Sequence, residues 1–284
     1  MDFTIETYKL FLQSMQECDY SFLMVKEFIN SKKSKAIILR HDVDLLPQNS
    51  LRFAKIQHQL GIQGSYYFRA VPQSWDENII KEIASLGHEV GYHYENMDTC
   101  NGDIDKAWDN FRMNLDELRK LVDVKTICMH GSPRSKFDNK ELWSKYDYRS
   151  LDLIGEPYYD VDFDKVLYLT DTGRRWDGWK TSVRDKVPQQ KDWIKQGLVF
   201  HSTQDIINIF STGQTLSASP ELLPMSEAEG NRRGVEVPNQ IMFTMHPQRW
   251  HNKQLPWLKE LVMQNAKNQI KKVLIKTQDT PHNT

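Results

Sequence analysis

Carboxylate and imidazole side chains come after short apolar runs at several widely separated places in the chain. They are Asp42, Asp44, His93, His130 and His246. These groups are ligands for divalent metals such as zinc, and imidazole also serves as a general acid or base near neutral pH. If the fold brings them together, they can support metal-assisted hydrolysis.

The two aspartates stand in the segment Arg40-His41-Asp42-Val43-Asp44. Side chains two residues apart in an extended chain point to the same face, so Asp42, Asp44 and Arg40 are expected to share one. Two carboxylates on one face repel each other, and a metal ion or Arg40 would relieve that repulsion. The alternative for Asp44 is that it caps a helix beginning near Pro47.

Each histidine has more than one interpretation. His93 ends a strand and, beside the two aspartates, would complete a plausible metal site, whereas His88 lies on the opposite face of that strand and is expected to be structural. His130 is open between metal ligand, substrate contact and loop anchor. His246 is a candidate general acid, and a buried, hydrogen-bonded histidine is the equal alternative.

The segments that position these side chains alternate in type. Apolar runs indicate strands at 36–40, 65–68, 88–93, 126–129, 166–169, 198–200 and 241–243. Helical spacing indicates helices at 47–60, 77–86, 103–122 and 255–272. Such alternation predicts an α/β barrel of parallel strands, with polar residues at the strand ends carrying the chemistry. A doubly wound sheet is the alternative. We expect residues 1–34 to form a helical preface and residues 35–284 to form the barrel domain.

Composition narrows the function classes. The chain has 284 residues and a formal net charge of -1, so bulk electrostatics predict neither a nucleic-acid partner nor a membrane partner. Residues 1–6 lack the basic and apolar regions of a signal peptide, and we therefore expect a cytoplasmic protein. The sequence does not fix the oligomeric state.

Three segments resemble, in order, the motifs of the polysaccharide deacetylases, the carbohydrate esterase family with the nodulation-factor deacetylase fold. They are Arg40-His41-Asp42-Val43-Asp44, Gly87-His88-Glu89-Val90-Gly91-Tyr92-His93 and His246-Pro247. The resemblance covers about residue 36 to about residue 250. It implies a distorted (β/α) barrel of about seven parallel strands and metal-dependent removal of acetyl groups from sugars. It gives Asp42 the role of general base and His246 that of catalytic acid.

The metal site departs from the family pattern at two positions. The family has two adjacent aspartates, whereas Val43 stands at the second position here, so the metal role passes to Asp44. The family has a second histidine four residues after the one that matches His93, and this chain has Met97 there. A thioether does not replace imidazole as a zinc ligand. The resemblance therefore implies zinc bound by Asp44 and His93, with the third ligand open.

Three outcomes fit this departure: His130 or Glu95 completes the site, the metal binds weakly, or no metal binds. Our leading hypothesis is a hydrolase that removes an acyl group, expected to be acetyl, from an amino sugar or a glycan precursor, with a carbohydrate or nucleotide sugar as substrate. Arg40, His130 and Trp250 are the expected substrate contacts. The alternatives are an inactive carbohydrate-binding pseudoenzyme and a metal-independent hydrolase of an amide C–N bond.

Overall fold

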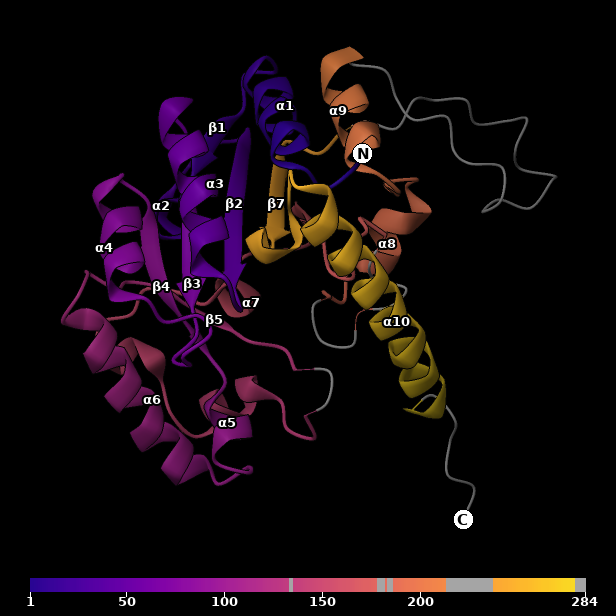
Figure 1. The fold of residues 1–284 in the computed structure, drawn as a ribbon. Coiled ribbons are helices and arrows are strands. Elements are labelled where there is room, and N and C mark those ends of the chain that lie inside the picture. The colour runs from indigo at the N-terminus through magenta and orange to yellow at the C-terminus, as the bar shows by residue number, and fades with distance from the viewer. Residues whose placement is uncertain (133–134, 178–181, 183–185, 213–236, 279–284) are drawn as a thin grey trace.

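A parallel β-sheet that curls into a half-barrel forms the centre of the molecule, and helices pack around it (Figure 1). The computed structural model describes residues 1–132, 135–177, 182, 186–212 and 237–278. The sheet confirms the predicted α/β fold, a distorted barrel of parallel strands.

The seven strands found in the described part of the chain all pair in parallel. They are β1 Ser21–Leu23, β2 Ala36–Val43, β3 Ser65–Phe68, β4 Glu89–Tyr94, β5 Ile127–Met129, β6 Val166–Thr170 and β7 Gln240–Met245. Their order is β5-β4-β3-β2-β7-β6, and β1 pairs with the first half of β2. Among the described residues β5 and β6 are therefore the two edges, and β2 lies near the middle.

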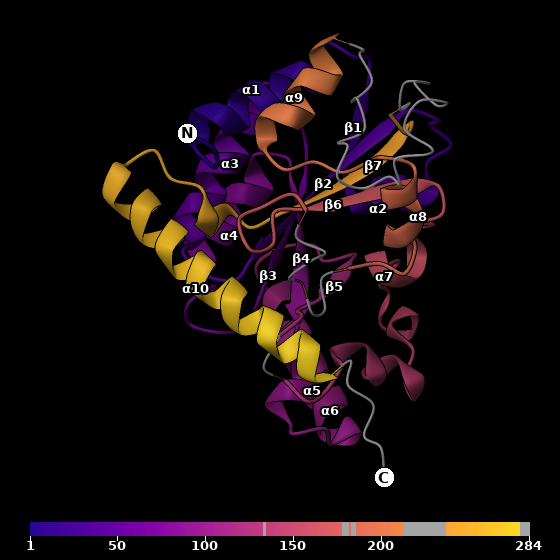
Figure 2. The same ribbon diagram turned by 90° about the vertical axis from the view of Figure 1, so that its right-hand side faces the viewer.

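Helices cover both sides of the sheet (Figure 2). They are α1 Ile5–Gln16, α2 Val25–Asn30, α3 Pro47–Gln59, α4 Glu77–Ser85, α5 Asn96–Thr99, α6 Ile104–Arg119, α7 Pro157–Asp160, α8 Gln190–Lys195, α9 Thr203–Thr212 and α10 Gln254–Gln278. Short 3-10 turns are η1 Asn139–Ser144, η2 Tyr148–Leu151 and η5 Pro247–Arg249. The side chains of Asp76 and Asp103 accept hydrogen bonds from the free backbone N–H groups of Ile79 and Lys106 in the first turns of α4 and α6, which explains where these helices begin.

The alternation of side chains along β2 separates the core from the candidate site. Ile37 and Leu39 point into the main core beneath the helices, whereas Ile38 packs in a second apolar cluster on the other face. Arg40 and Asp42 follow Ile38 at intervals of two residues and therefore share its face. All eight residues of β2 are buried, as expected for a parallel strand covered on both faces.

The number of strands is as predicted, but one of them lies elsewhere. Residues 198–200 form no strand: the Leu198 N–H bonds the Trp193 carbonyl oxygen and closes α8, and Leu198 and Phe200 are buried by packing alone. The seventh strand is instead β1, which was not predicted and lies within residues 1–34, the segment expected to be helical. Pairing with Ala36–Ile38 extends this segment, because it supplies the hydrogen bonds of a parallel ladder. The domain boundary at residue 34 stays a prediction.

Candidate active site

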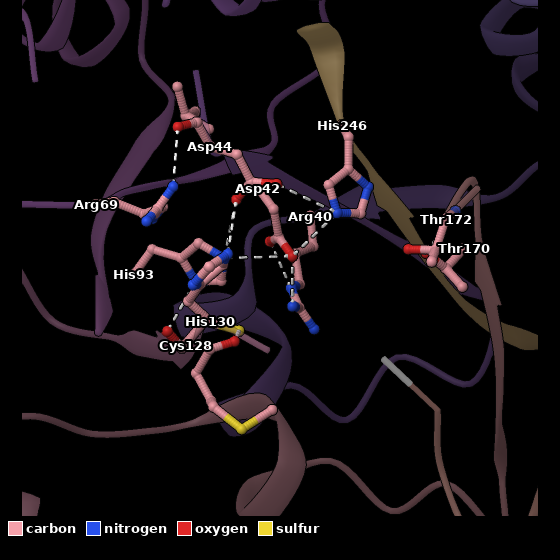
Figure 3. A network of polar contacts seen from close by, with 12 residues as sticks. Arg40, Asp42, Asp44, Arg69, His93, Cys128, His130, Thr170, Thr172 and His246 are labelled. Carbon is pink, nitrogen blue, oxygen red and sulfur yellow. Dashed lines mark hydrogen bonds and ion pairs between the residues drawn. The ribbon is translucent and has the colours of Figure 1, made fainter. Parts of the chain in front are cut away.

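The residues predicted to carry the chemistry lie together at the carboxyl ends of the strands (Figure 3). Oδ2 of Asp42, on β2, is 3.6 Å from Nε2 of His93, on β4, and 4.0 Å from Nε2 of His246, directly after β7. The strand order explains this meeting, because β2 pairs with β3 and β7, and β4 is the next strand beyond β3. In a parallel sheet the carboxyl ends of these strands lie along the same edge.

Asp44 follows the end of β2 directly and faces three imidazoles. Its Oδ1 atom is 3.7 Å from Nε2 of His93 and 3.6 Å from Nε2 of His130, and its Oδ2 atom is 3.9 Å from Nε2 of His246. Gln248 donates a hydrogen bond of 3.2 Å to Oδ2. The buried Oδ1 atom has no hydrogen-bond partner in the described part of the chain. A buried carboxylate oxygen in this situation is costly unless a further group meets it.

Each of the three imidazoles is held through Nδ1 by an oxygen atom. His93 bonds the Cys128 carbonyl oxygen at 2.9 Å, His130 bonds Oε2 of Glu95 at 2.8 Å, and His246 bonds Oδ1 of Asp171 at 2.6 Å. Because carbonyl and carboxylate oxygens only accept hydrogen bonds, Nδ1 carries the proton in each neutral ring, and Nε2 presents its lone pair to the site. Oxygen atoms that orient imidazoles in this way accompany metal-binding histidines in proteins.

Three of the four carboxylates in the site are each paired with an arginine. The pairs are Arg40–Asp42 at 2.6 Å, Arg69–Glu95 at 2.8 Å and Arg249–Asp171 at 3.0 Å. Among the residues that the structure describes, no arginine or lysine forms an ion pair with the Asp44 carboxylate. Asp44 is therefore the carboxylate of the site whose charge a bound cation would balance.

Burial and neighbouring charges set the protonation of the site. Burial raises the pKa of Asp44, but the facing imidazoles, that of His130 most strongly, outweigh burial and leave the pKa below its usual value. Burial holds the pKa of His93 well below its usual value, so this ring is neutral at pH 7. Burial also lowers the pKa of His130, but its hydrogen bond to Glu95 and the charge of Asp44 raise it by more. An ionised Asp44 and a neutral His93 are the forms that bind a metal ion.

The structure brings in functional candidates that the sequence analysis missed. Asp171, which is fully buried, accepts hydrogen bonds from Nδ1 of His246, from Nη1 of Arg249 and from Nε1 of Trp250. Arg69 holds Glu95 and also donates to the Asp44 carbonyl oxygen. Asp171 directly follows β6 and Arg69 directly follows β3, so a search of every strand end would have found both.

One alternative for a single residue is excluded, and two expectations stay open. The Trp250 ring is fully buried and its Nε1 atom donates to Asp171 at 2.7 Å, and its role as a substrate contact stays a prediction. Asp44 does not cap the following helix, because the N-cap of α3 is Leu46. Arg40, 1% exposed, is bound to Asp42, and its role as a substrate contact stays a prediction.

Two overlapping sets of side chains could hold a metal ion. Ligand atoms of Asp42, His93 and Cys128 all lie within 4.8 Å of one another, but both Asp42 oxygens already bond Arg40. In the second set the separations of 3.7 and 3.6 Å from Asp44 Oδ1 to the two Nε2 atoms, those of His93 and His130, are close to the ~3.4 Å between two ligands at a tetrahedral zinc. The second set also accounts for the unpartnered Oδ1 atom. One carboxylate oxygen and two imidazole nitrogens are donor types that a divalent metal such as zinc binds.

Met97 does not take part in either set. It lies in α5, is 3% exposed and packs in the main core. The imidazole nearest to Asp44 Oδ1 belongs instead to His130, directly after β5. Besides His93, a second imidazole therefore faces Asp44 Oδ1, and it comes from the end of β5 and not from the position of Met97.

Comparison with known proteins finds no matching family model and no matching curated protein. Solved structures do match. A pseudoenzyme of carbohydrate esterase family 4 from Bacillus anthracis, BA3943, has 11% identity and a TM-score of 0.42; the match covers 85% of this chain and 63% of that one, so this chain spans less than two thirds of that structure. A family 4 carbohydrate esterase from Bacillus anthracis has 9% identity and a TM-score of 0.39, with 92% and 86% covered.

A third match is PdaA of Bacillus subtilis, a family 4 carbohydrate esterase, with 12% identity and a TM-score of 0.38 over 90% of this chain and 83% of that one. These neighbours belong to the family that the sequence motifs resemble. Because the TM-scores and identities are low, the function proposed below rests on the geometry of the site.

Proposed function

We propose that this protein is a metal-dependent hydrolase that removes an acetyl group from an amino sugar or glycan precursor, as a divergent member of the polysaccharide deacetylase family. The observation that carries the proposal is the buried Oδ1 atom of Asp44, which lacks a hydrogen bond within the described residues and faces two anchored imidazoles. In the other three carboxylates of the site both oxygens accept hydrogen bonds, as is expected of buried structural carboxylates.

Asp44, His93 and His130 would hold the metal. A divalent ion, with zinc as the first candidate, would supply Lewis-acid polarisation of the acyl carbonyl group. Glu95 fixes the His130 ring through Nδ1, and Arg69 fixes Glu95 through two hydrogen bonds from Nη2 and one from Nε. These contacts direct Nε2 of His130 at Asp44, and the hydrogen bond from Nδ1 of His93 to the Cys128 carbonyl oxygen does the same for His93.

Asp42 and His246 would move the protons. Arg40 fixes the Asp42 carboxylate through two hydrogen bonds of 2.8 and 2.6 Å, beside the place where a water molecule would attack. Asp42 would take the proton of that water. Asp171 holds Nδ1 of His246, so Nε2 is the atom that would protonate the leaving amine. Two positioned groups of this kind each contribute roughly 10²–10⁴-fold to a rate.

The test combines a binding measurement with a reaction. A chelator first removes any bound metal, and the metal-free protein is titrated with zinc. Acetate release is then followed from acetylated amino sugars and from a nucleotide sugar that carries an N-acetyl group. Zinc-dependent release that Asp42→Asn abolishes without weakening zinc binding is the expected result. His58, exposed on α3, offers the control His58→Gln, which should change neither quantity.

The outcomes separate the alternatives. Zinc binding with no acetate release from any of these substrates would contradict the hydrolase and support a carbohydrate-binding protein. Acetate release that persists in the chelated protein would contradict the metal-dependent mechanism and support metal-independent hydrolysis. Full activity of Asp42→Asn would remove Asp42 as the base.

A further inference from the structure

Helix α10 exposes an apolar face to the outside. Its exposed large apolar residues are Leu255, Leu258, Val262, Met263 and Ile270, which are 82%, 51%, 60%, 40% and 59% exposed. Leu255, Leu258, Val262 and Ile270 recur at intervals that bring them to one side of a helix. Over the described residues, the other exposed large apolar side chains are scattered over several segments. Clustering of this kind marks an interaction surface.

The opposite side of α10 faces the protein and carries two buried amide side chains beside the half-buried Trp257 and Leu261. Gln264 and Asn268 are buried, at 7% and 5% exposure, and Asn268 donates from Nδ2 to the Gly173 carbonyl oxygen. The guanidinium of Arg174 lies 4.3 Å from the centre of the Trp257 ring and donates to the Trp257 carbonyl oxygen. A surface helix usually keeps its large apolar residues on the inward side, whereas α10 carries several on its outward side as well. The outward face of α10 therefore suits a partner with an apolar layer.

The charge of α10 selects among such partners. Residues 254–278 contain five lysines and one glutamate, a surplus of four positive charges in a chain whose net charge is -1. Two copies of the helix would bring these positive charges together, which opposes self-association. An anionic lipid surface offers both an apolar layer and negative charge, and helices with a basic polar face and an apolar face lie in such surfaces.

We propose that α10 docks the protein on an anionic membrane surface, with the helix lying along the headgroup boundary. Figures 1 and 2 show α10 on the outside of the fold, with its C-terminal end extending beyond the sheet. None of the described helices combines the length and hydropathy that crossing a bilayer requires. The expectation of no membrane partner rested on net charge, which averages over the local surplus of α10.

The inward side of α10 contacts a loop of the candidate site. Gly173 and Arg174, which contact α10, belong to the loop that begins with Asp171. The proposal itself is independent of the deacetylase chemistry, because it rests only on the exposure, packing and charge of the helix.

Vesicle co-sedimentation of the full chain tests the docking. The protein should sediment with vesicles of phosphatidylcholine mixed with phosphatidylglycerol, stay in solution with phosphatidylcholine alone, and be released by salt. Each lysine replaced in Lys259→Gln/Lys267→Gln should weaken binding about fivefold. Each apolar residue replaced in Leu258→Gln/Val262→Gln should weaken it about tenfold or more.

The matched control is Leu10→Gln/Met113→Gln, which removes two apolar side chains that are 56% and 55% exposed on α1 and α6. It should bind like the unchanged protein. Sedimentation with neither vesicle, equal sedimentation with both, or an equal loss in the control would overturn the proposal. A dimer in light scattering without lipid that Leu258→Gln/Val262→Gln converts to a monomer would overturn it as well, because the face would then join two copies.

Discussion

Glu156 carries a fully buried carboxyl group whose titration should be visible in the stability of the protein. Glu156 directly precedes α7. Its carboxylate accepts hydrogen bonds from the backbone N–H groups of Met129, at 3.0 Å, and Tyr158, at 2.6 Å. Burial raises the pKa of Glu156 from 4.5 to about 7, and these hydrogen bonds and the charge of Arg40 oppose the rise only in part. The folded protein thus keeps a proton that the unfolded chain releases.

The sign and size of the effect follow from linkage. Because the pKa is higher in the folded state, the contribution of Glu156 to stability is fully present below pH 4.5 and is lost as the pH rises to about 7. A pKa difference of this size corresponds to about 3 kcal/mol of unfolding free energy. Above pH 7 the contribution stays constant, since both states are then ionised.

Urea unfolding of the natural protein and of Glu156→Gln, at pH values from about 5 to about 8, isolates this effect. Glutamine does not ionise, and it deprives one backbone N–H of its acceptor at a cost of about 1–3 kcal/mol that does not vary with pH. Other buried groups, such as His41 with a pKa lowered by burial to about 3, titrate alike in both proteins and cancel. The difference in unfolding free energy should shift by about 2–3 kcal/mol in favour of Glu156→Gln as the pH rises. A difference that is constant over this range would refute the reasoning.

Three further predictions concern the site and the sheet. Asp171→Asn should lower acetate release roughly 10²–10⁴-fold on N-acetyl substrates, because His246 loses its anchor, and much less on aryl acetates, whose leaving group needs no acid; equal losses would contradict the acid role. His130→Gln should weaken zinc binding by more than about tenfold in a competition titration, and unchanged affinity would exclude it as a ligand. Gly91→Ala should cost about 1–3 kcal/mol or more in urea unfolding, since the added Cβ would lie 2.5 Å from the Tyr67 ring; unchanged stability would contradict that packing.

The architecture was predictable because strand and helix alternate clearly in the first half of the chain. The unbroken apolar run of β2 and the helix from Pro47 leave little choice there. Residues 198–200 and β1 show where the pattern fails. Both segments are short and apolar, and only the tertiary structure decides that Ser21–Leu23 pairs with β2 while Leu198 closes α8. Hydrophobic runs of three residues report burial, and burial alone does not distinguish pairing from packing.

Within the site, residue type and spacing identified the groups that meet but not the contacts that hold them. Asp42, His93 and His246 were found because each stands at the end of a strand in a recognisable motif. Asp171 was missed because the segment Thr170-Asp171-Thr172-Gly173 reads as an ordinary turn. Only the structure shows that its carboxylate lies between Nδ1 of His246 and an arginine. The role of His130 stayed open for the same reason.

One rule accounts for most of the site: it is built from the residue that directly follows each of six neighbouring strands. These residues are Asp44, Arg69, Glu95, His130, Asp171 and His246, after β2, β3, β4, β5, β6 and β7. Side chains from adjacent strands bond each other, as in the Arg69–Glu95, Glu95–His130 and Asp171–His246 pairs.

Contacts between distant strands depend on a property that the sequence does not display. His130 follows β5 and Asp44 follows β2, three strands away, and a flat sheet would separate them by about 14 Å. The observed separation between His130 Nε2 and Asp44 Oδ1 is 3.6 Å. The curl of the sheet, together with side-chain reach, therefore brings the proposed metal ligands together. Substitutions that flatten the sheet should weaken metal binding even where every ligand is kept.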